Sequence, residues 1–269
     1  MRYKIKTSCF CKNKNILKNY IEYNEKPNKE TYFGISNKDY YRAYNFCDNC
    51  SHFFAKHKFD LQKLYKRKYS TYSYGTIKKI NKNYLKIINL PIKKSDNKNR
   101  FHRLKKYIKK DFLSLDIGSG LGVFPYEFKK RGIKIDCIEK DINLANHLKQ
   151  QKFNLISNDI FKIKIKNHYN FVSINKVLEH LEKPGRFLKK AFSLTKKNGY
   201  LYIELPSISA LKDRKEGKLR EEFFIEHFHI FSKKSLLKMF VNYKIKIIFL
   251  RNIIEPSGKY SLVGLFKKI

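Results

Sequence analysis

The chain has 269 residues and carries 60 Lys and Arg against 23 Asp and Glu, a formal net charge of +37 at pH 7. This length suffices for one large domain with a real hydrophobic core and a second, smaller one. No apolar run approaches the ~20 residues that a membrane helix needs, and the first residues lack the apolar core of a secretory signal. We therefore expect a cytoplasmic protein without a transmembrane segment.

The positive charge is distributed along the whole chain. Most of the excess is Lys, interspersed with Asn, Ile and Tyr, whereas Arg, the better bidentate ligand of phosphate and guanine, is scarce. Scattered Lys is typical of a solvated surface, although a charge of this size favours non-specific binding of polyanions. The charge alone therefore does not identify a nucleic-acid-binding protein.

Residues 1–70 contain four of the five cysteines, in two close pairs: Cys9 with Cys11, and Cys47 with Cys50. Four thiolates suit a tetrahedral zinc ion, and in a cytoplasmic protein this role is more common than a disulfide. The first pair has only one intervening residue, fewer than the usual zinc knuckle. His52 or His57 could therefore replace one ligand, and four cysteines without metal are the alternative. We expect a zinc-binding domain over residues 1–70.

Two amphipathic helices are predicted between residues 71 and 108. In the first, apolar residues recur at helical spacing, at Ile77, Ile80, Tyr84 and Ile87. Pro91 and a polar stretch end that pattern, and a second helix then carries Phe101, Leu104 and Ile108 on one face. We expect these helices to connect the cysteine domain to a larger domain over residues 109–269.

From residue 112 onward, strand-like and helical segments alternate, which predicts an α/β fold with a mostly parallel sheet. The strand candidates are residues 112–116, 133–138, 154–157, 171–174 and 200–204. Asp141 and Ser232 are expected to cap helices. Two final strands, 245–250 and 261–266, are separated by a stretch too short for a parallel crossover, so the last strand should run in reverse.

A glycine-rich stretch after the first of these strands is the most specific feature of the chain. Its glycines lie at alternate positions: Gly118, Gly120 and Gly122. Glycines let the backbone turn sharply and approach a ligand, and the helix predicted from Val123 to Lys130 directs free N–H groups at that ligand. Asp116 precedes the glycines, and Glu139 ends the next strand, where a carboxylate can accept two hydrogen bonds from a ribose diol.

This pattern resembles the class I S-adenosylmethionine-dependent methyltransferases, whose first motif reads acidic-x-Gly-x-Gly-x-Gly. The spacing differs from the Gly-x-Gly-x-x-Gly of dinucleotide-binding Rossmann proteins, and a purely structural turn is the other interpretation. The resemblance covers residues 112–269. It implies a Rossmann-like methyltransferase sheet, mostly parallel with a reversed last strand, and S-adenosyl-L-methionine as the cofactor.

The resemblance also implies roles for individual residues. Asp116 and Gly118 would hold the methionine part of the cofactor, and Glu139 would bind its ribose hydroxyls. Asp159, after the third strand, matches an Asp that accepts from the adenine amino group, although a plain turn or cap residue is the alternative. Asn175 follows the fourth strand, where the loop reaches the cofactor.

The next residues, Val177 to His180, resemble the Val-Leu-Glu-His run of family members that act on small molecules. His180 lies near the expected acceptor, and its intrinsic pKa suits a general base. A structural or cofactor-side role is the alternative, because this His occurs in members with unrelated substrates.

A second cluster lies in residues 206–232, the insertion that usually builds the acceptor pocket. Glu226 and His227 could form an acid–base pair there. Together with the four-cysteine module, they resemble the last two positions of the Tyr-His-Glu-His run in nucleotide-sugar C-methyltransferases, which have an N-terminal zinc-binding domain. Phe224 and Ile225 replace the first two positions of that run.

Other residues leave the acceptor chemistry open. Tyr72 or Tyr74 could supply the missing phenol, although ordinary packing is the simpler role for both. His227 and His229 could instead cap or pack the helix that follows Ser232.

The sequence thus predicts methyl transfer to a small molecule, a sugar or nucleotide-sugar in surface polysaccharide synthesis. The alternatives are an RNA or DNA methyltransferase, an O-methyltransferase of a lipid or quinone-like metabolite, and a non-enzymatic zinc-dependent binding module. Lys176 follows Asn175 where enzymes that methylate base amines carry Asn-Pro-Pro-Tyr, and Cys137 lies inside a predicted strand. Both observations disfavour methylation of nucleic-acid bases.

Overall fold

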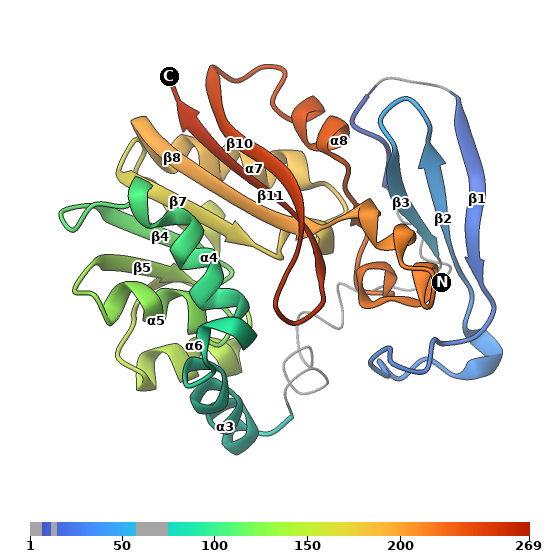
Figure 1. The fold of residues 1–269 in the computed structure, drawn as a ribbon, viewed down its shortest axis with the longest axis horizontal. Coiled ribbons are helices and arrows are strands. Elements are labelled where there is room, and N and C mark those ends of the chain that lie inside the picture. Colours follow the sequence, from blue (N-terminus) through green and yellow to red (C-terminus); the bar gives the residue numbers. More distant parts are fainter. Residues whose placement is uncertain (1–6, 12–14, 58–74) are drawn as a thin grey trace.

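The computed structural model describes residues 7–11, 15–57 and 75–269, which form a small and a large β-sheet (Figure 1). The small sheet is antiparallel, with the order β1-β2-β3-β9. Its strands are β1 (Ile16–Tyr23), β2 (Arg42–Cys47), β3 (His52–His57) and β9 (His229–Ile230). The last of these comes from the segment 206–232, so that segment completes a sheet built mainly from the first part of the chain.

The large sheet has the order β10-β11-β8-β7-β4-β5-β6. Its strands are β4 (Leu113–Ile117), β5 (Lys134–Ile138), β6 (Asn154–Ser157), β7 (Tyr169–Asn175), β8 (Thr195–Pro206), β10 (Ile245–Ile254) and β11 (Tyr260–Lys268). Neighbours from β6 to β8 run parallel, and β11 is antiparallel to both β8 and β10. The prediction of a mostly parallel sheet with a reversed last strand is therefore confirmed. Strand β8 begins earlier than predicted because its first residues are polar and hide the strand pattern.

Helices cover both faces of the large sheet. On one face lie α7 (Pro184–Leu194) and α8 (Lys233–Lys238), and on the other α4 (Asp96–Leu104) and α5 (Val123–Lys129). The core residues alternate along β7: Val172 packs in the cluster that contains Leu188 of α7, whereas Phe171 contacts Phe128 of α5. This alternation is expected for a central strand that is buried on both faces.

The two helices predicted between residues 71 and 108 pack on the large-sheet part of the molecule. Helix α3 (Ile77–Ile88) contacts α5 and α6 (Ile142–Gln150), and α4 contacts α5. Helix α4 ends at Leu104, sooner than predicted, and a 3-10 turn over Lys105–Tyr107 follows. Ile108 is nevertheless buried in the same cluster as Phe101 and Leu104, so the predicted apolar face is present.

Both predicted helix caps are confirmed. The Asp141 carboxylate accepts hydrogen bonds from the backbone N–H groups of Asn143 and Leu144 at the start of α6. The Ser232 hydroxyl accepts from the Ser235 N–H, and the Ser235 hydroxyl lies 2.9 Å from the Ser232 N–H. These bonds satisfy N–H groups that a helix start leaves without partners.

A buried ion pair ties the small sheet to the segment 206–232. Arg42 is fully buried and donates to Glu30 at 2.9 Å and to the carbonyl of Phe223. Glu30 also accepts from the backbone N–H of Ile225 at 2.7 Å. The aromatic rings of Phe223 and Phe228 lie in the same core cluster as Tyr44 and Phe53 of the small sheet. The two stretches of chain therefore share one core.

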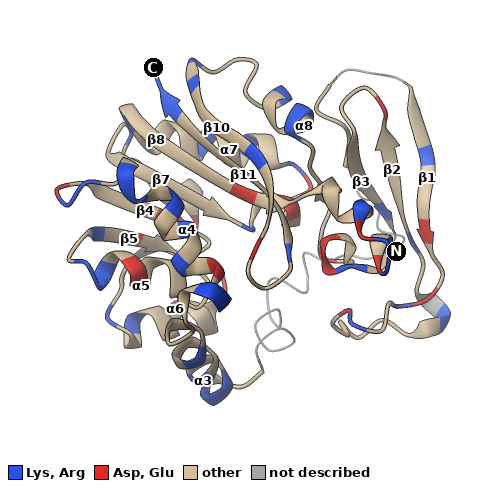
Figure 2. Cartoon of the chain, viewed as in Figure 1, with Lys and Arg blue, Asp and Glu red and all other residues tan. Residues whose placement is uncertain are grey.

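Figure 2 shows Lys and Arg spread over the helices and strand ends of both sheets. Within the part of the chain that the structure describes, none of the helices has the length and apolar character needed to cross a membrane.

Candidate active site

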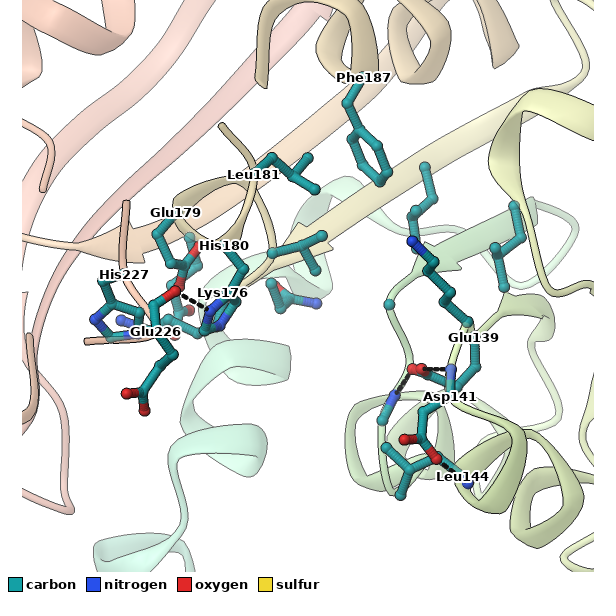
Figure 3. Close-up of a pocket in the computed structure, with 18 of the residues that line it drawn as sticks. Glu139, Asp141, Leu144, Lys176, Glu179, His180, Leu181, Phe187, Glu226 and His227 are labelled. Atoms are coloured by element: carbon teal, nitrogen blue, oxygen red, sulfur yellow. Dashed lines mark hydrogen bonds between the residues drawn. The ribbon is translucent and has the colours of Figure 1, made fainter. Parts of the chain in front are cut away.

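A cavity of about 950 Å³ opens at the carboxyl ends of the parallel strands, where open α/β sheets bind their ligands. One end is lined by the glycine-rich loop and by residues that follow β5 and β6. The other end is lined by residues that follow β7 and by the segment 206–232. Figure 3 shows these two groups of side chains facing the same space.

The glycine-rich loop is held in a conformation that side chains disfavour. Its three glycines, Gly118, Gly120 and Gly122, have φ values of 76°, 54° and 76°. A Cβ on Gly118 would lie 2.4 Å from Val177, and one on Gly122 would lie 2.7 Å from Leu148. A Cβ on Gly120 would meet nothing within 4 Å. Two of the glycines are therefore required by packing, and the middle one faces open space.

Asp116 is buried behind the loop, at the end of β4. It accepts hydrogen bonds from the Ser173 hydroxyl at 2.5 Å and from the Asn175 amide nitrogen at 2.9 Å. Burial raises the pKa of Asp116 to about 6. Asn175 lines the cavity, and its amide oxygen is buried without a hydrogen-bond partner among the described residues. Asp116 thus fixes the orientation of Asn175.

Glu139 bridges the loop and the helix that follows β5. Its two carboxylate oxygens accept from the backbone N–H groups of Gly120 at 2.7 Å and Asp141 at 2.9 Å (Figure 3). Burial raises the pKa of Glu139 to about 7. Each oxygen has a second lone pair, so the carboxylate can still accept from a ligand in the cavity.

Asp159 caps a short turn and also borders the cavity. Its carboxylate accepts from the backbone N–H of Phe161 at 2.9 Å and so caps the short 3-10 turn Ile160–Lys162. It also lines the cavity, on the same side as Glu139.

His180, Glu226 and His227 lie close together at the opposite end of the cavity. The His180 Nδ1 atom lies 3.0 Å from the Glu226 carbonyl oxygen, and the two imidazole rings are 4.9 Å apart between centroids. The His227 Nδ1 atom lies 2.9 Å from the Glu222 carbonyl oxygen. Burial lowers the pKa of His180 to about 4 and that of His227 well below its usual value. Both rings are therefore neutral near pH 7.

Sequence reasoning missed two residues at this end of the cavity, Lys176 and Glu179. The Lys176 Nζ atom donates to the Ser261 hydroxyl at 2.8 Å, and burial lowers the Lys176 pKa. Glu179 is fully buried, and burial raises its pKa to about 8. Glu179 lies inside the Val-Leu-Glu-His run, but nothing in that run indicates that its carboxylate is buried. Burial likewise raises the pKa of Glu226 to about 7.

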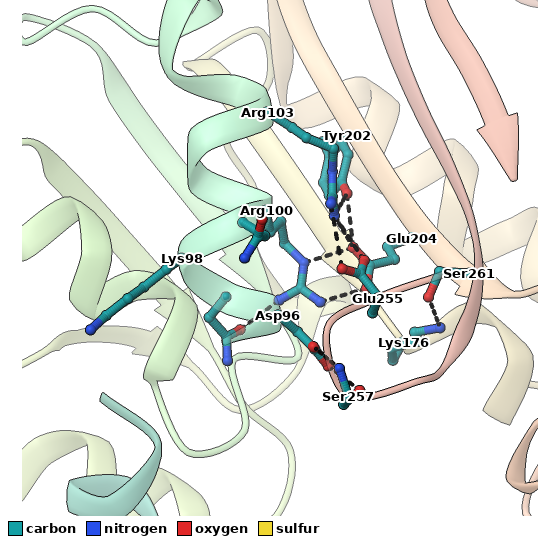
Figure 4. Close-up of polar contacts among 12 residues, drawn as sticks. Asp96, Lys98, Arg100, Arg103, Lys176, Tyr202, Glu204, Glu255, Ser257 and Ser261 are labelled. Atoms are coloured by element: carbon teal, nitrogen blue, oxygen red, sulfur yellow. Dashed lines mark hydrogen bonds and ion pairs between the residues drawn. The ribbon is translucent and has the colours of Figure 1, made fainter. Parts of the chain in front are cut away.

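An ion-pair network holds α4 beside the cavity (Figure 4). Arg100 donates to Glu204 of β8 at 2.7 Å, and Arg103 donates to Glu255 in the β10–β11 hairpin at 2.8 Å. Burial acts to raise the pKa of Glu204, but the neighbouring Arg100 charge outweighs it and lowers that pKa to about 2. Asp96, at the start of α4, accepts from the Ser257 backbone N–H at 3.0 Å. The network thus connects three elements at the rim.

The four N-terminal cysteines come together in a separate cluster. The sulfur–sulfur distances are 3.1 Å for Cys9 and Cys50, 3.4 Å for Cys9 and Cys11 and for Cys11 and Cys47, and 3.7 Å for Cys47 and Cys50. Four thiolates at ~2.3 Å from a tetrahedral zinc ion would be about 3.8 Å apart. The donor set and its spacing therefore fit zinc, and the C-x-C pair does not prevent this.

The other histidines named for these sites lie elsewhere. His52 pairs with His229 at 3.1 Å between ring nitrogens, in the buried contact between β3 and β9. His52 is therefore directed at β9. His229 has a packing role, but against His52 and the Glu182 carbonyl rather than against the helix that follows Ser232. The side chain of His57 and the whole of Tyr72 and Tyr74 lie outside the described residues.

Comparisons with known proteins agree with this geometry. A family model described as "Methyltransferase domain" matches residues 93–248, more than half of the chain. No curated protein matches.

Solved structures resemble the fold. A SAM-dependent methyltransferase from Methanosarcina mazei is 17% identical, with a TM-score of 0.51 over 62% of this chain and 97% of that one. A possible histamine N-methyltransferase from Thermotoga maritima is 17% identical, with a TM-score of 0.52 over 70% and 95%. A Burkholderia thailandensis 1,6-didemethyltoxoflavin-N1-methyltransferase, solved with bound S-adenosylhomocysteine, is 13% identical, with a TM-score of 0.51 over 71% and 86%.

Proposed function

Because this chain belongs to the methyltransferase-domain family and is an S-adenosylmethionine-dependent methyltransferase, we propose that its acceptor is a sugar or nucleotide-sugar of surface polysaccharide synthesis. The observation that carries this proposal is the convergence of His180, Glu226 and His227 at the end of the cavity opposite the glycine loop. The four-cysteine cluster supports it, because nucleotide-sugar C-methyltransferases combine such a module with a Glu-His pair.

The cofactor occupies the glycine-loop end of the cavity in this proposal. Glu139 accepts from the ribose hydroxyls, and Asp159 accepts from the adenine amino group. Asn175, oriented by Asp116, presents its buried amide oxygen to the methionine part. The loop glycines Gly118, Gly120 and Gly122 let the backbone approach the cofactor.

Methyl transfer is an in-line displacement in which the bond from methyl carbon to sulfur breaks as the new bond to the acceptor forms. The electron pair of the broken bond stays on sulfur, and the acceptor loses a proton. A neutral imidazole can take that proton, so His180 or His227 acts as the base and Glu226 orients it or stabilises its charge.

The cysteine cluster is proposed as a structural zinc site with Cys9, Cys11, Cys47 and Cys50 as ligands. Such a site would fix the small sheet, which pairs with β9 and so holds the residues just before β9 that line the acceptor end. None of the five cysteines forms a disulfide, so the four sulfur atoms of the cluster are available as ligands.

Transfer of labelled methyl groups tests the acceptor. Purified enzyme is incubated with labelled S-adenosylmethionine and separate panels of nucleotide-sugars, lipids, quinone-like phenols and RNA. Label in a nucleotide-sugar supports the proposal, and label only in RNA or a lipid contradicts it.

Variants of the two histidines test the catalytic assignment in the same assay. His180→Ala and His227→Ala should lower turnover by ~10²–10⁴ and leave cofactor affinity nearly unchanged, because a general base acts on the acceptor only. Loss of stability with turnover per folded molecule retained would make both histidines structural. His168→Ala, immediately before β7 and outside the cavity, is the matched control.

A further inference from the structure

Three potential metal ligands meet at the acceptor end of the cavity: the Glu179 carboxylate and the imidazoles of His180 and His227 (Figure 3). One ligand atom from each residue lies within 4.8 Å of the other two. Glu179 and His180 are adjacent in the 3-10 turn Leu178–His180 after β7, whereas His227 comes from the segment 206–232. Two parts of the chain that are far apart in sequence therefore build one ligand set.

The Glu179 carboxylate is fully enclosed. Its side chain is buried, and neither oxygen has a hydrogen-bond partner among the described residues. The nearby Lys176 ammonium is bonded to the Ser261 hydroxyl instead, and no ion pair of the described chain includes Glu179. A buried carboxylate is strongly unfavourable unless a cation or several donors complete its environment. Its oxygens lie beside two imidazoles, which identifies the position that a cation would occupy.

The imidazoles are oriented for ligation. The Nδ1 atoms of His180 and His227 lie 3.0 Å and 2.9 Å from backbone carbonyl oxygens, those of Glu226 and Glu222. A carbonyl only accepts, so each neutral ring carries its hydrogen on Nδ1 and its lone pair on Nε2. Metal-binding histidines are oriented by the same type of hydrogen bond from the nitrogen that does not bind the metal.

We propose that Glu179, His180 and His227 bind one divalent first-row transition-metal cation that contacts the acceptor. Two imidazoles and one carboxylate favour Mn²⁺, Fe²⁺ or Zn²⁺ over Mg²⁺ and Ca²⁺, which prefer oxygen ligands. Three protein ligands leave coordination positions open, and two neighbouring hydroxyls of an acceptor can fill them. This site rests on the proposed function, because the acceptor must lie at this end of the cavity.

A bound cation changes how the acceptor loses its proton. The imidazole lone pairs are then used as ligands, so the cation favours ionisation of the acceptor hydroxyl and Glu226 receives the proton. The bond from oxygen to the methyl carbon forms as the carbon–sulfur bond breaks, with the electron pair left on sulfur. The imidazole-base route applies only to the metal-free enzyme.

Binding of Mn²⁺ tests the site apart from activity. The full chain is loaded with one equivalent of zinc for the cysteine cluster and titrated with Mn²⁺, followed by electron paramagnetic resonance. Thiolates bind Mn²⁺ poorly, so the cysteines do not compete. We expect one Mn²⁺ per chain, at least tenfold weaker binding in Glu179→Gln and His227→Gln, and wild-type binding in Glu182→Gln, a control carboxylate that lines the same cavity.

Folded wild-type protein that binds neither Mn²⁺ nor a second zinc ion overturns the proposal, as does wild-type binding in both ligand variants. Circular dichroism and cofactor binding establish that each variant is folded, and His227→Gln decides if Glu179→Gln does not fold. Methylation of a sugar without metal binding contradicts this site alone. Metal binding with no methylated sugar contradicts the proposed acceptor alone.

Discussion

The three glycines of the loop have different physical roles, although the motif treats them alike. Gly118 and Gly122 are enclosed by Val177 and Leu148, so a side chain at either position disrupts packing before it affects a ligand. Gly120 faces open space in the cavity, and its φ of 54° is the only strain that a side chain would meet. Gly120 is therefore the position at which cofactor binding can be tested separately from folding.

We predict that Gly120→Leu abolishes binding of S-adenosylmethionine while the protein remains folded. The leucine side chain would occupy the cofactor space, and the left-handed backbone adds a cost of roughly 1–2 kcal/mol. Calorimetry measures binding, and thermal unfolding measures stability. Gly217→Leu is the matched control, because Gly217 also has a positive φ, of 46°, and open surroundings but lies away from the cavity. Normal affinity in Gly120→Leu would place the cofactor elsewhere.

The raised pKa of Glu139 predicts a pH-dependent stability of the cofactor-free enzyme. Burial raises this pKa from 4.5 to about 7, so the folded state favours the neutral carboxyl. The raised pKa of Glu139 therefore adds to the free energy of unfolding below pH 4.5, and this contribution is lost as the pH rises through 7. Glu139→Gln mimics the neutral form, so its melting temperature should rise relative to wild type between pH 5 and pH 8. A constant difference across that range would show that Glu139 ionises normally.

The cofactor end of the cavity could be predicted from the sequence, whereas the acceptor end could be predicted only in part. Gly118, Gly120 and Glu139 line that end of the cavity and lie in short, contiguous motifs at strand ends, which can be recognised in the sequence. The burial of Glu179 depends on Phe228, whose backbone N–H donates to the Glu179 carbonyl at 2.7 Å from a distant segment. No local pattern indicates that contact, so the ligand set around it could not be foreseen.

Among the elements, α4 shows what sequence periodicity leaves open. It lies in the predicted connector and its amphipathic face is present, and its polar residues lie at the cavity rim. Arg100 and Arg103 reach β8 and the β10–β11 hairpin through Glu204 and Glu255. Sequence periodicity identifies the buried face of a helix but not the partner of a buried Arg, because that partner is 104 residues away for Arg100.

We predict that Arg100→Met destabilises the fold strongly, by about 3–5 kcal/mol, because it leaves Glu204 buried without its main counter-charge. Urea unfolding gives the change in free energy. Lys29→Met is the control: Lys29 pairs with Glu216, and their side chains are 73% and 36% exposed, so its loss should cost about 0–1 kcal/mol. Equal effects of the two substitutions would show that the Arg100 pair contributes no more than a surface pair.

At the scale of the complete chain, the acceptor end depends on the small sheet. Among the described residues, strand β9 pairs with β3 at the edge of the small sheet, and Ser232 donates to the carbonyl of Cys50 beside the cysteine cluster. The wall that carries Glu226 and His227 is thus attached to the cysteine cluster, whereas the cofactor end is built from the large sheet.

We therefore predict that removal of zinc lowers turnover but preserves cofactor binding. Metal analysis of Cys-intact protein purified with zinc present should find at least one zinc per chain, and Cys47→Ser should contain one zinc fewer. Chelation, or Cys47→Ser, should increase hydrogen exchange in the small sheet and in residues 223–231. Cys137→Ser, in β5, is the control and should retain zinc. Far less than one zinc per chain, or a cofactor affinity that falls with the metal, would contradict this arrangement.

The pairing of β3 with β9 also limits how this enzyme can diversify. A homologous exchange that replaces only residues 15–57 would place a foreign strand against β9 and a foreign partner against the Ile225 amide. An exchange of residues 206–232 alone would fail because a foreign β9 would then have to pair with the original β3, and a foreign backbone amide with the original Glu30. Recombination can therefore introduce a new acceptor preference only when both stretches are exchanged together. An engineered chimaera should take residues 15–57 and 206–232 from the same donor protein. The ~150 residues between them can remain those of the recipient.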